Sequence, residues 1–328
     1  MAGAGDDEDR QNLPGNWKGM LKFCIENTAS EDSPSRPGPM DEETKKWLQE
    51  VFASLADNDP VKHMAENIQQ LQQSCESEDD IHRHTDLLDD TQALCEDIDL
   101  AMDFQKMGAY GVVQGLLQSE HADIRWRAAQ LIATVVQNNP HCQQKALETQ
   151  LLPLLVHLAD SDANMLVRVK ALYAVSCLVR QFPEGEEAFV SVDGFSVLMR
   201  AMQSDEEKLQ VKAAFLLANI MLSDPKHKDT LCDMGMIEQL MNLLRCEQAP
   251  YHEHLVRALV NLVTDHPRSL EECQRPQHAL KDLLSQLMTD LQGKPEYLVS
   301  VTVNKLFIYH YIVLIIVNVL EKILFRIS

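Results

Sequence analysis

An apolar helical segment that recurs at a fixed spacing constrains this chain more than any other feature. It first appears at residues 124–138 as IRWRAAQLIATVVQN and returns at 166–181, 209–223 and 253–265. One early position of each copy is basic or histidine, and these positions lie 43, 42 and 42 residues apart: Arg127, Lys170, Lys212 and His254. Helical repeats of about this length are typical of armadillo and HEAT solenoids, in which each unit buries its apolar face against the next.

Each repeat is predicted to hold two further helices before this long one. We expect the first helices at 97–107, 141–147, 184–192 and 226–234, and the second at 110–117, 151–158, 195–202 and 236–244. The turns between them carry Gly108, Gly194 and Gly235, with Gln150 in the second repeat, because glycine adopts the left-handed conformation that ends many helices. Three helices per unit favour armadillo over HEAT repeats. The sequence therefore predicts an all-α, right-handed superhelical armadillo solenoid with about four repeats at 97–265.

Prolines are expected to separate one repeat from the next. Proline cannot continue a helix, but it suits the first turn of a new one. The four prolines that follow the long helices are Pro140, Pro183, Pro225 and Pro267.

The segments that flank the repeats are predicted to cap or extend the stack. Residues 41–96 are expected to form three N-terminal capping helices, the second starting at Pro60 and the third covering about 81–94. Residues 266–297 are expected to form a partial fifth repeat that serves as the C-terminal cap. Terminal units of a solenoid need such caps because they lack a neighbour on one side.

Residues 1–40 are predicted to be a flexible acidic segment that carries one short amphipathic island. The apolar residues of the island are Trp17, Leu21, Phe23 and Ile25, and three prolines between 31 and 40 separate it from the first capping helix. Two interpretations remain open. The island is either a short helix docked on its own domain or a mobile, peptide-like element that binds a groove on a partner.

Residues 298–328 differ in composition from everything before them. They are rich in β-branched residues, and the apolar stretch 306–320 is only 15 residues long, shorter than the ~20 residues of a spanning helix. We therefore expect an atypical terminus that arises by splicing or intron read-through, with a membrane tail anchor as the alternative.

The charge and the cysteines of the chain indicate which partners and which cellular compartment to expect. The net charge is −21, and residues 1–103 carry 25 acidic against 8 basic side chains; an acidic chain repels phosphate backbones, so nucleic acid is not an expected partner. The eight cysteines form no CxxC pair, which indicates free thiols in a reducing compartment. The N-terminus, MAGAGDDEDR, lacks the basic region of a signal peptide. These features predict the cytosol, with the nucleus as a further compartment, and no membrane partner.

No motif for catalysis or metal binding is present. The sequence lacks GxSxG, HExxH, a P-loop and GxGxxG. The two His clusters, at 82–84 and 252–254, place their residues two apart, where side chains on a helix diverge. We therefore expect a non-enzymatic protein without a metal or cofactor.

The remaining candidate site is the face that the long helices expose along the groove of the solenoid. Positions spaced by four and by seven or eight residues on each copy are predicted to line this concave face. The predicted binding residues are Trp126, Gln130, Thr134, Tyr173, Cys177, Arg180, Phe215, Asn219, Arg257 and Asn261. The aromatic residues are typical of binding hot spots, and armadillo grooves often use an asparagine to hold the backbone of a ligand. The alternative is that some of these aromatics pack between repeats.

Several long segments resemble one known family. They include WKGMLKFCI, MDEETKKWLQE, IRWRAAQLIATVVQNN, VRVKALYAVSCLVR, HKDTLCDMGMIEQL and HEHLVRALVNLV. These segments are similar to the armadillo-type nucleotide exchange factors of heat shock protein 70, the family of heat-shock-protein-binding protein 1 and the yeast Fes-type factors. The resemblance runs from about residue 16 to 297 and ends there, where the family continues with a charged helix.

The resemblance implies a co-chaperone. Its concave face would bind the ATPase domain of the chaperone and promote release of ADP, and the island at 17–25 would contact the client-binding domain. A chaperone-associated ubiquitin ligase is a further partner that it implies. The alternative function is a generic armadillo scaffold or adaptor without exchange activity.

Overall fold

The computed structural model describes residue 46 and residues 59–223, 226–246, 252–280 and 282–283. The chain divides into two units, Met1–Asn58 and Asp59–Ser328, and the fold discussed here is that of the second. Within the described residues, this unit contains fifteen α-helices, one 3-10 turn and no strand. The prediction of an all-α fold is confirmed.

Four units of three helices make up most of the described chain, in the order that the sequence predicts. The first helices are α5 (Ile98–Lys106), α8 (Pro140–Glu148), α11 (Pro183–Ser191) and α14 (His227–Asp233). The second helices are α6 (Ala109–Leu117), α9 (Leu151–Ser161), α12 (Gly194–Met202) and α15 (Met236–Arg245). The third helices are α7 (Ala122–Val136), α10 (Met165–Val179), α13 (Glu207–Ser223) and α16 (His252–Val263).

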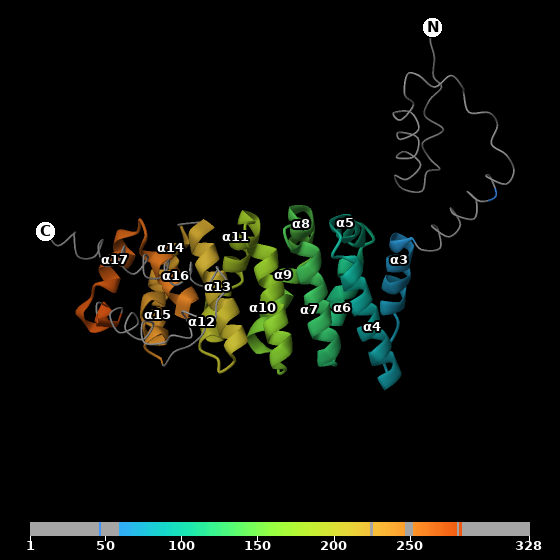
Figure 1. Ribbon diagram of the computed structural model, residues 1–328, viewed down its shortest axis with the longest axis horizontal. Helices are drawn as coiled ribbons and strands as arrows, with labels where there is room; N and C mark the ends of the chain where they lie inside the picture. Colours follow the sequence, from blue (N-terminus) through green and yellow to red (C-terminus); the bar gives the residue numbers. More distant parts are fainter. Residues whose placement is uncertain (1–45, 47–58, 224–225, 247–251, 281, 284–328) are drawn as a thin grey trace, which may run out of the picture. The chain divides into compact units, whose positions relative to one another are not determined.

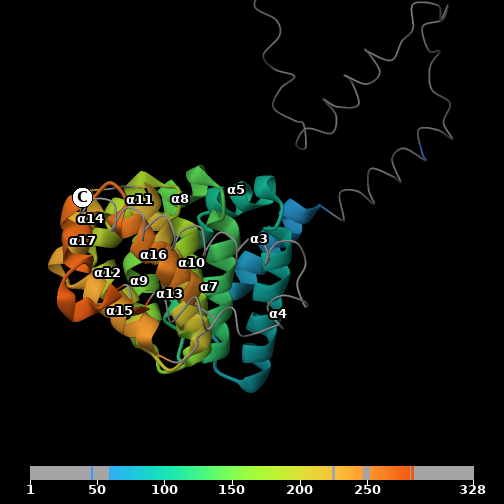
Figure 2. The same ribbon diagram turned by 60° about the vertical axis from the view of Figure 1, so that its left-hand side comes forward.

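The third helices lie side by side and form one continuous layer. Packing joins α7 to α10, α10 to α13 and α13 to α16, and Figures 1 and 2 show the units in chain order from α3 to α17. At the N-terminal end, α4 (Glu78–Leu94) packs against α7 in the same manner, and α3 (Pro60–Leu71) packs against α4. At the other end, α17 (Pro267–Cys273) and the 3-10 turn Pro276–His278 follow α16. The predicted first capping helix and the segments 1–40 and 298–328 lie outside the described residues.

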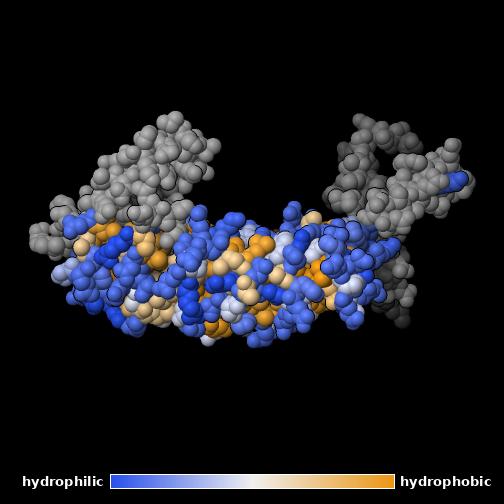
Figure 3. Space-filling model, turned by 90° about the horizontal axis from the view of Figure 1, so that it is seen from below, coloured by the Kyte–Doolittle hydropathy of each residue, from blue (hydrophilic) through white to orange (hydrophobic). Residues whose placement is uncertain are grey.

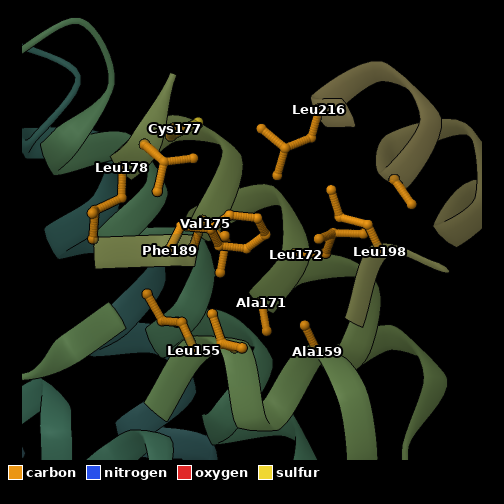
Figure 4. Packing of buried hydrophobic residues seen from close by; sticks show 14 of the residues in the cluster. Leu155, Ala159, Ala171, Leu172, Val175, Cys177, Leu178, Phe189, Leu198 and Leu216 are labelled. Atoms are coloured by element: carbon orange, nitrogen blue, oxygen red, sulfur yellow. The ribbon is translucent and has the colours of Figure 1, made fainter. Parts of the chain in front are cut away.

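The core runs the length of this stack between the helices. On the side of α7 and α10 opposite the predicted binding residues, the apolar side chains are fully buried: Ala128, Leu131, Ile132 and Val135 on α7, and Ala171, Val175 and Leu178 on α10. In Figure 4, side chains from α9, α11, α12 and α13 surround those of α10, including Leu155, Phe189, Leu198 and Leu216. Burial of each large aliphatic side chain contributes about 1.5–3 kcal/mol. Because the third helices are buried on several sides, only a narrow stripe of each reaches solvent.

The turn between the first and second helix of every repeat contains one residue in the left-handed conformation. The four residues are Gly108, Gln150, Asp193 and Gly235, with φ of 74°, 59°, 59° and 72°. The prediction for the third repeat was therefore wrong, since Asp193 rather than Gly194 adopts the turn. Gly194 is the first residue of α12, and a Cβ at this position would collide with the Phe189 ring. The glycine is needed there for close packing, not for its backbone freedom.

A second left-handed residue follows the third helix wherever the structure describes this junction, after α7, α10 and α16. Asn138, Gln181 and Asp265 have φ of 54°, 59° and 54°. Pro140, Pro183 and Pro267 then form the first residue of α8, α11 and α17, which confirms these predictions, whereas Pro225 lies outside the described residues.

On three of the third helices, α7, α10 and α13, a polar side chain near the start of the helix bonds to the segment before it. Arg125 donates to the Ser119 carbonyl at 2.8 Å, Arg168 donates to the Ala159 carbonyl at 3.1 Å, and Gln210 donates to the Ser204 carbonyl at 2.6 Å. Arg125 also forms a nearly buried ion pair with Asp162, with Nε–Oδ2 at 2.7 Å. Burial alone would raise the pKa of Asp162, but hydrogen bonds from Arg125 and from the Asn164 amide outweigh it, so this pKa is lowered.

Gln150→Gly should stabilise the fold. A residue with a Cβ in the left-handed conformation is strained by roughly 1 kcal/mol, and glycine removes this strain, although glycine also costs more chain entropy on folding. We expect a net gain of about 0.5 kcal/mol in the free energy of unfolding, measured by urea denaturation. The matched control Gln150→Ala keeps the Cβ and should give no gain. A loss of stability in Gln150→Gly would show that the Gln150 side chain matters more than the backbone strain.

Candidate functional site

The partly exposed stripe of the third helices forms a continuous surface, which we call the third-helix face. It consists of the side chains of α7, α10, α13 and α16 that do not pack into the core. The predicted residues that are partly exposed on it are Trp126, Gln130, Thr134, Tyr173, Arg180, Phe215, Asn219, Arg257 and Asn261. Cys177 is different, since only 4% of its surface is exposed. Burial raises the pKa of the Cys177 thiol, so this residue packs as a small apolar side chain beneath the face.

Side-chain contacts cross this face from each helix to the next in a regular ladder. Arg127 of α7 binds Asp89 of α4, with Nε–Oδ2 at 2.9 Å. Lys170 of α10 donates to Gln130 of α7 at 2.7 Å. Two further rungs follow: Lys212 Nζ lies 4.4 Å from the Tyr173 ring centroid, and the Phe215 and His254 rings meet edge to face at 5.5 Å. The four repeat-marking residues of the sequence are thus one side of a ladder that ties neighbouring third helices together.

The aromatic side chains of the face are engaged by cations as well as by the core. The Trp126 ring has the Arg127 guanidinium at 4.1 Å and Lys170 Nζ at 5.7 Å from its centroid, and its Nε1 donates to Asp123 at 3.0 Å. Arg180 lies 5.7 Å from the Phe215 ring centroid. These rings therefore pack between repeats and still contribute partly exposed surface. The two interpretations of them, packing and binding, are compatible.

The two asparagines bond within the solenoid. Asn219 donates to the Phe215 carbonyl of its own helix at 2.7 Å, while Asn261 of α16 donates to the Ala218 carbonyl of α13 at 2.8 Å. Asn261 thus links two neighbouring helices. Each amide nitrogen carries a second hydrogen, so these bonds leave it able to donate to a ligand as well.

Lys170 and Lys212, like Arg127 and His254, lie on this face but were predicted only as markers of the repeat, not as site residues. Burial, followed by the nearby charge of Lys208, lowers the pKa of Lys170; burial, followed by the charge of Lys170, lowers the pKa of Lys212. The available signal was their spacing from predicted site residues, because residues three apart on a helix share a face: Lys170 precedes Tyr173 by three residues, and Lys212 precedes Phe215 by three.

One cluster has the residue types of a hydrolase but not the geometry. His266 Nε2 lies 3.3 Å from Asp229, and its Nδ1 accepts from the Ser269 amide at 3.2 Å. Ser269 has no exposed surface, so its hydroxyl cannot meet a substrate, and His266 is the N-cap of α17. The cluster is a helix cap.

Three further properties of the described residues bear on the site. They contain no group of three or more side chains suited to a metal ion. None of their helices combines the length and the apolar character required to cross a bilayer. The seven cysteines among them are all free thiols.

The island residues Trp17, Leu21, Phe23 and Ile25 lie outside the described part of the chain, so their role stays a prediction.

Solved structures with a similar arrangement of helices are armadillo proteins. The designed armadillo repeat protein YIII(Dq)4CqI is 17% identical, with a TM-score of 0.61, and the match covers 77% of this chain and 99% of that one. A computationally designed armadillo repeat protein for modular peptide recognition gives a TM-score of 0.63 at 17% identity, covering 78% and 99%. At this identity, the comparison defines the fold class alone: an armadillo solenoid.

Sequence comparison then defines the family. A profile described as SIL1/FES1/HPBP1 C-terminal domain matches residues 100–230, and one described as nucleotide exchange factor Fes1 matches residues 17–104. Hsp70-binding protein 1 from rat is 42% identical over 295 residues, covering 87% of this chain and 82% of the relative. The human protein of that name is also 42% identical, over 294 residues with the same coverage. Hsp70 nucleotide exchange factor FES1 from Mycosarcoma maydis is 34% identical over 143 residues, covering 44% of this chain and 36% of that protein. The chain belongs to the family of Hsp70-binding protein 1 and Fes1.

Proposed function

We propose that this protein is a co-chaperone that binds the ATPase domain of heat shock protein 70 through its third-helix face and promotes release of ADP. The observation that carries the proposal is its 42% identity over 82% of the length of proteins named Hsp70-binding protein 1, together with relatives named Hsp70 nucleotide exchange factor. The protein performs no chemistry of its own in this function. Its contribution is a binding surface.

The mechanism is thermodynamic linkage. A protein that binds the nucleotide-free ATPase domain more tightly than the ADP-bound domain must weaken ADP binding by the same factor. To favour one arrangement of the chaperone, the binding surface must itself resist deformation. The ladder Asp89–Arg127, Gln130–Lys170, Tyr173–Lys212 and Phe215–His254 and the continuous core beneath it support such a rigid surface.

The alternative is an armadillo scaffold or adaptor that binds without accelerating nucleotide release. A chaperone-associated ubiquitin ligase remains a further proposed partner in either case. We also propose a cytosolic location, with the nucleus as a further compartment, which the family membership and the free cysteines support. Measurement of ADP release distinguishes the two functions, because only an exchange factor accelerates it.

Stimulated ADP release should depend on the middle of the third-helix face. The double substitution Phe215→Ala and Asn219→Ala should weaken binding to the ATPase domain by more than about 2 kcal/mol if these residues are central hot spots. Release of a fluorescent ADP analogue and binding calorimetry measure the two effects. The control is Ile98→Ala on α5, which removes an exposed apolar side chain from a first helix and should change neither.

Phe215 also packs against His254, so the substitution could reduce stability as well as binding. Thermal unfolding of the double variant checks that it is still folded. Unchanged binding and release in a folded double variant would contradict the assignment of this face.

We further propose that the island acts separately from the solenoid. Trp17, Leu21, Phe23 and Ile25 form an apolar, peptide-like segment, and Pro34, Pro37 and Pro39 follow it. A tether of this length gives the island an effective concentration in the mM range, so a weak contact with the client-binding domain suffices.

Deletion of residues 1–40 should therefore preserve stimulated ADP release and slow the release of bound client. Both rates are compared in one preparation, with the full-length chain as reference. A loss of both rates to the same degree would mean that the island is part of the folded domain. No change in either rate would mean that the island has no role in this cycle.

A further inference from the structure

Lys170 and Lys212 lie next to each other in the middle of the third-helix face. They occupy equivalent positions on α10 and α13, which pack side by side, and each is partly buried. The contacts of Lys170 are Gln130 Oε1 at 2.7 Å and the Trp126 ring, whose centroid is 5.7 Å away. Lys212 Nζ lies 4.4 Å from the Tyr173 ring centroid. Both ammonium groups are thus held in place by neutral neighbours.

Within the described residues, neither lysine has a carboxylate partner within ion-pair distance. The chain has 50 acidic and 29 basic residues, and several other cations of the stack do have a carboxylate partner. Arg127 binds Asp89 at 2.9 Å, Lys106 binds Asp103 at 2.8 Å, and Lys145 binds Glu148 at 2.7 Å. The two central lysines therefore carry charge that the solenoid itself does not neutralise.

In the free protein, partial burial and mutual repulsion both disfavour the charged forms of the two lysines. Burial lowers the pKa of both groups, and the charge of Lys170 lowers that of Lys212 further, while Lys208 acts on Lys170. An anion placed between the two lysines would relieve the repulsion. It would also interact strongly, because partial burial reduces the screening by water. The aromatic rings of Trp126, Tyr173 and Phe215 around the pair would exclude water at the edge of such a contact.

We propose that Lys170 and Lys212 form the anion-recognition centre of the third-helix face, and that their ligands are carboxylate side chains on the ATPase domain of the chaperone. This inference rests on the proposed function and specifies the chemistry of its interface. A protein carboxylate is favoured over a nucleic-acid phosphate because the whole chain carries a net charge of −21, which disfavours a polyanion. Binding of a single carboxylate requires only the two lysines at the centre of the face.

The test compares two double variants that remove the same charge from different faces. Lys170→Gln with Lys212→Gln neutralises the proposed centre, whereas Lys106→Gln with Lys145→Gln neutralises one lysine on each of the first helices α5 and α8. Calorimetry at a series of salt concentrations gives the Kd of the nucleotide-free ATPase domain for each. We expect the first variant to bind about tenfold or more weakly and to lose most of the salt dependence, while the second matches the wild type.

A second double variant keeps both positive charges and provides a test that does not depend on the folding of the Gln variant. Lys170→Arg with Lys212→Arg should retain the salt dependence of binding, and the wild-type protein should bind more weakly as salt rises. Wild-type affinity that does not change with salt would overturn the proposal without any variant. Equal affinity and equal salt dependence in the folded Gln variant would overturn it too, while stimulated ADP release by the wild type would leave the proposed function intact. If the wild type neither binds nor accelerates release, the proposed function itself is contradicted, and this inference with it.

Discussion

The lateral packing of one long helix per repeat against its counterpart in the next is the contact on which the structure depends. No unit of three short helices encloses its own apolar residues, so Leu131, Val175 and Leu216 are buried only because a neighbouring unit covers them. This requirement fixes the repeat length near 42 residues and favours the left-handed bends of the described turns. It also leaves one narrow stripe of each third helix for other uses.

The side chains of that stripe hold neighbouring repeats together and, in the proposed function, also bind the chaperone. Tyr173 holds Lys212, and Gln130 holds Lys170, across the joints between repeats, yet all four remain partly exposed. These two contacts hold the charges of Lys212 and Lys170 in place without neutralising them. The view in Figure 3, from the side of the turns between second and third helices, shows mostly hydrophilic surface with separate hydrophobic areas. On the part of that side that the structure describes, hydrophilic residues thus interrupt the hydrophobic areas.

Features that depend on the spacing of residues along the chain could be predicted from the sequence, whereas features that depend on contacts between distant residues could not. Helix bounds, the prolines at helix starts and the core residues Ala128 and Leu178 follow from local chemistry and apolar spacing. The turn at Asp193 could not be predicted, because Gly194 is required by the Phe189 ring, which packs against it from the preceding helix. Cys177 shares the spacing of exposed residues but is covered by its neighbours. The lysine pair was overlooked, since the absence of nearby carboxylates becomes visible only when separate repeats are brought together.

The most direct test of the central claim, that the third-helix face binds the chaperone, is site-specific photocrosslinking. Leu222, on the exposed stripe of α13, and Ile98, on the first helix α5, expose 72% and 58% of their surface, so a photoreactive amino acid at either position should not disturb the core. With the nucleotide-free ATPase domain present, the account predicts a crosslink from position 222 and none from position 98. A crosslink from position 98 alone would contradict it.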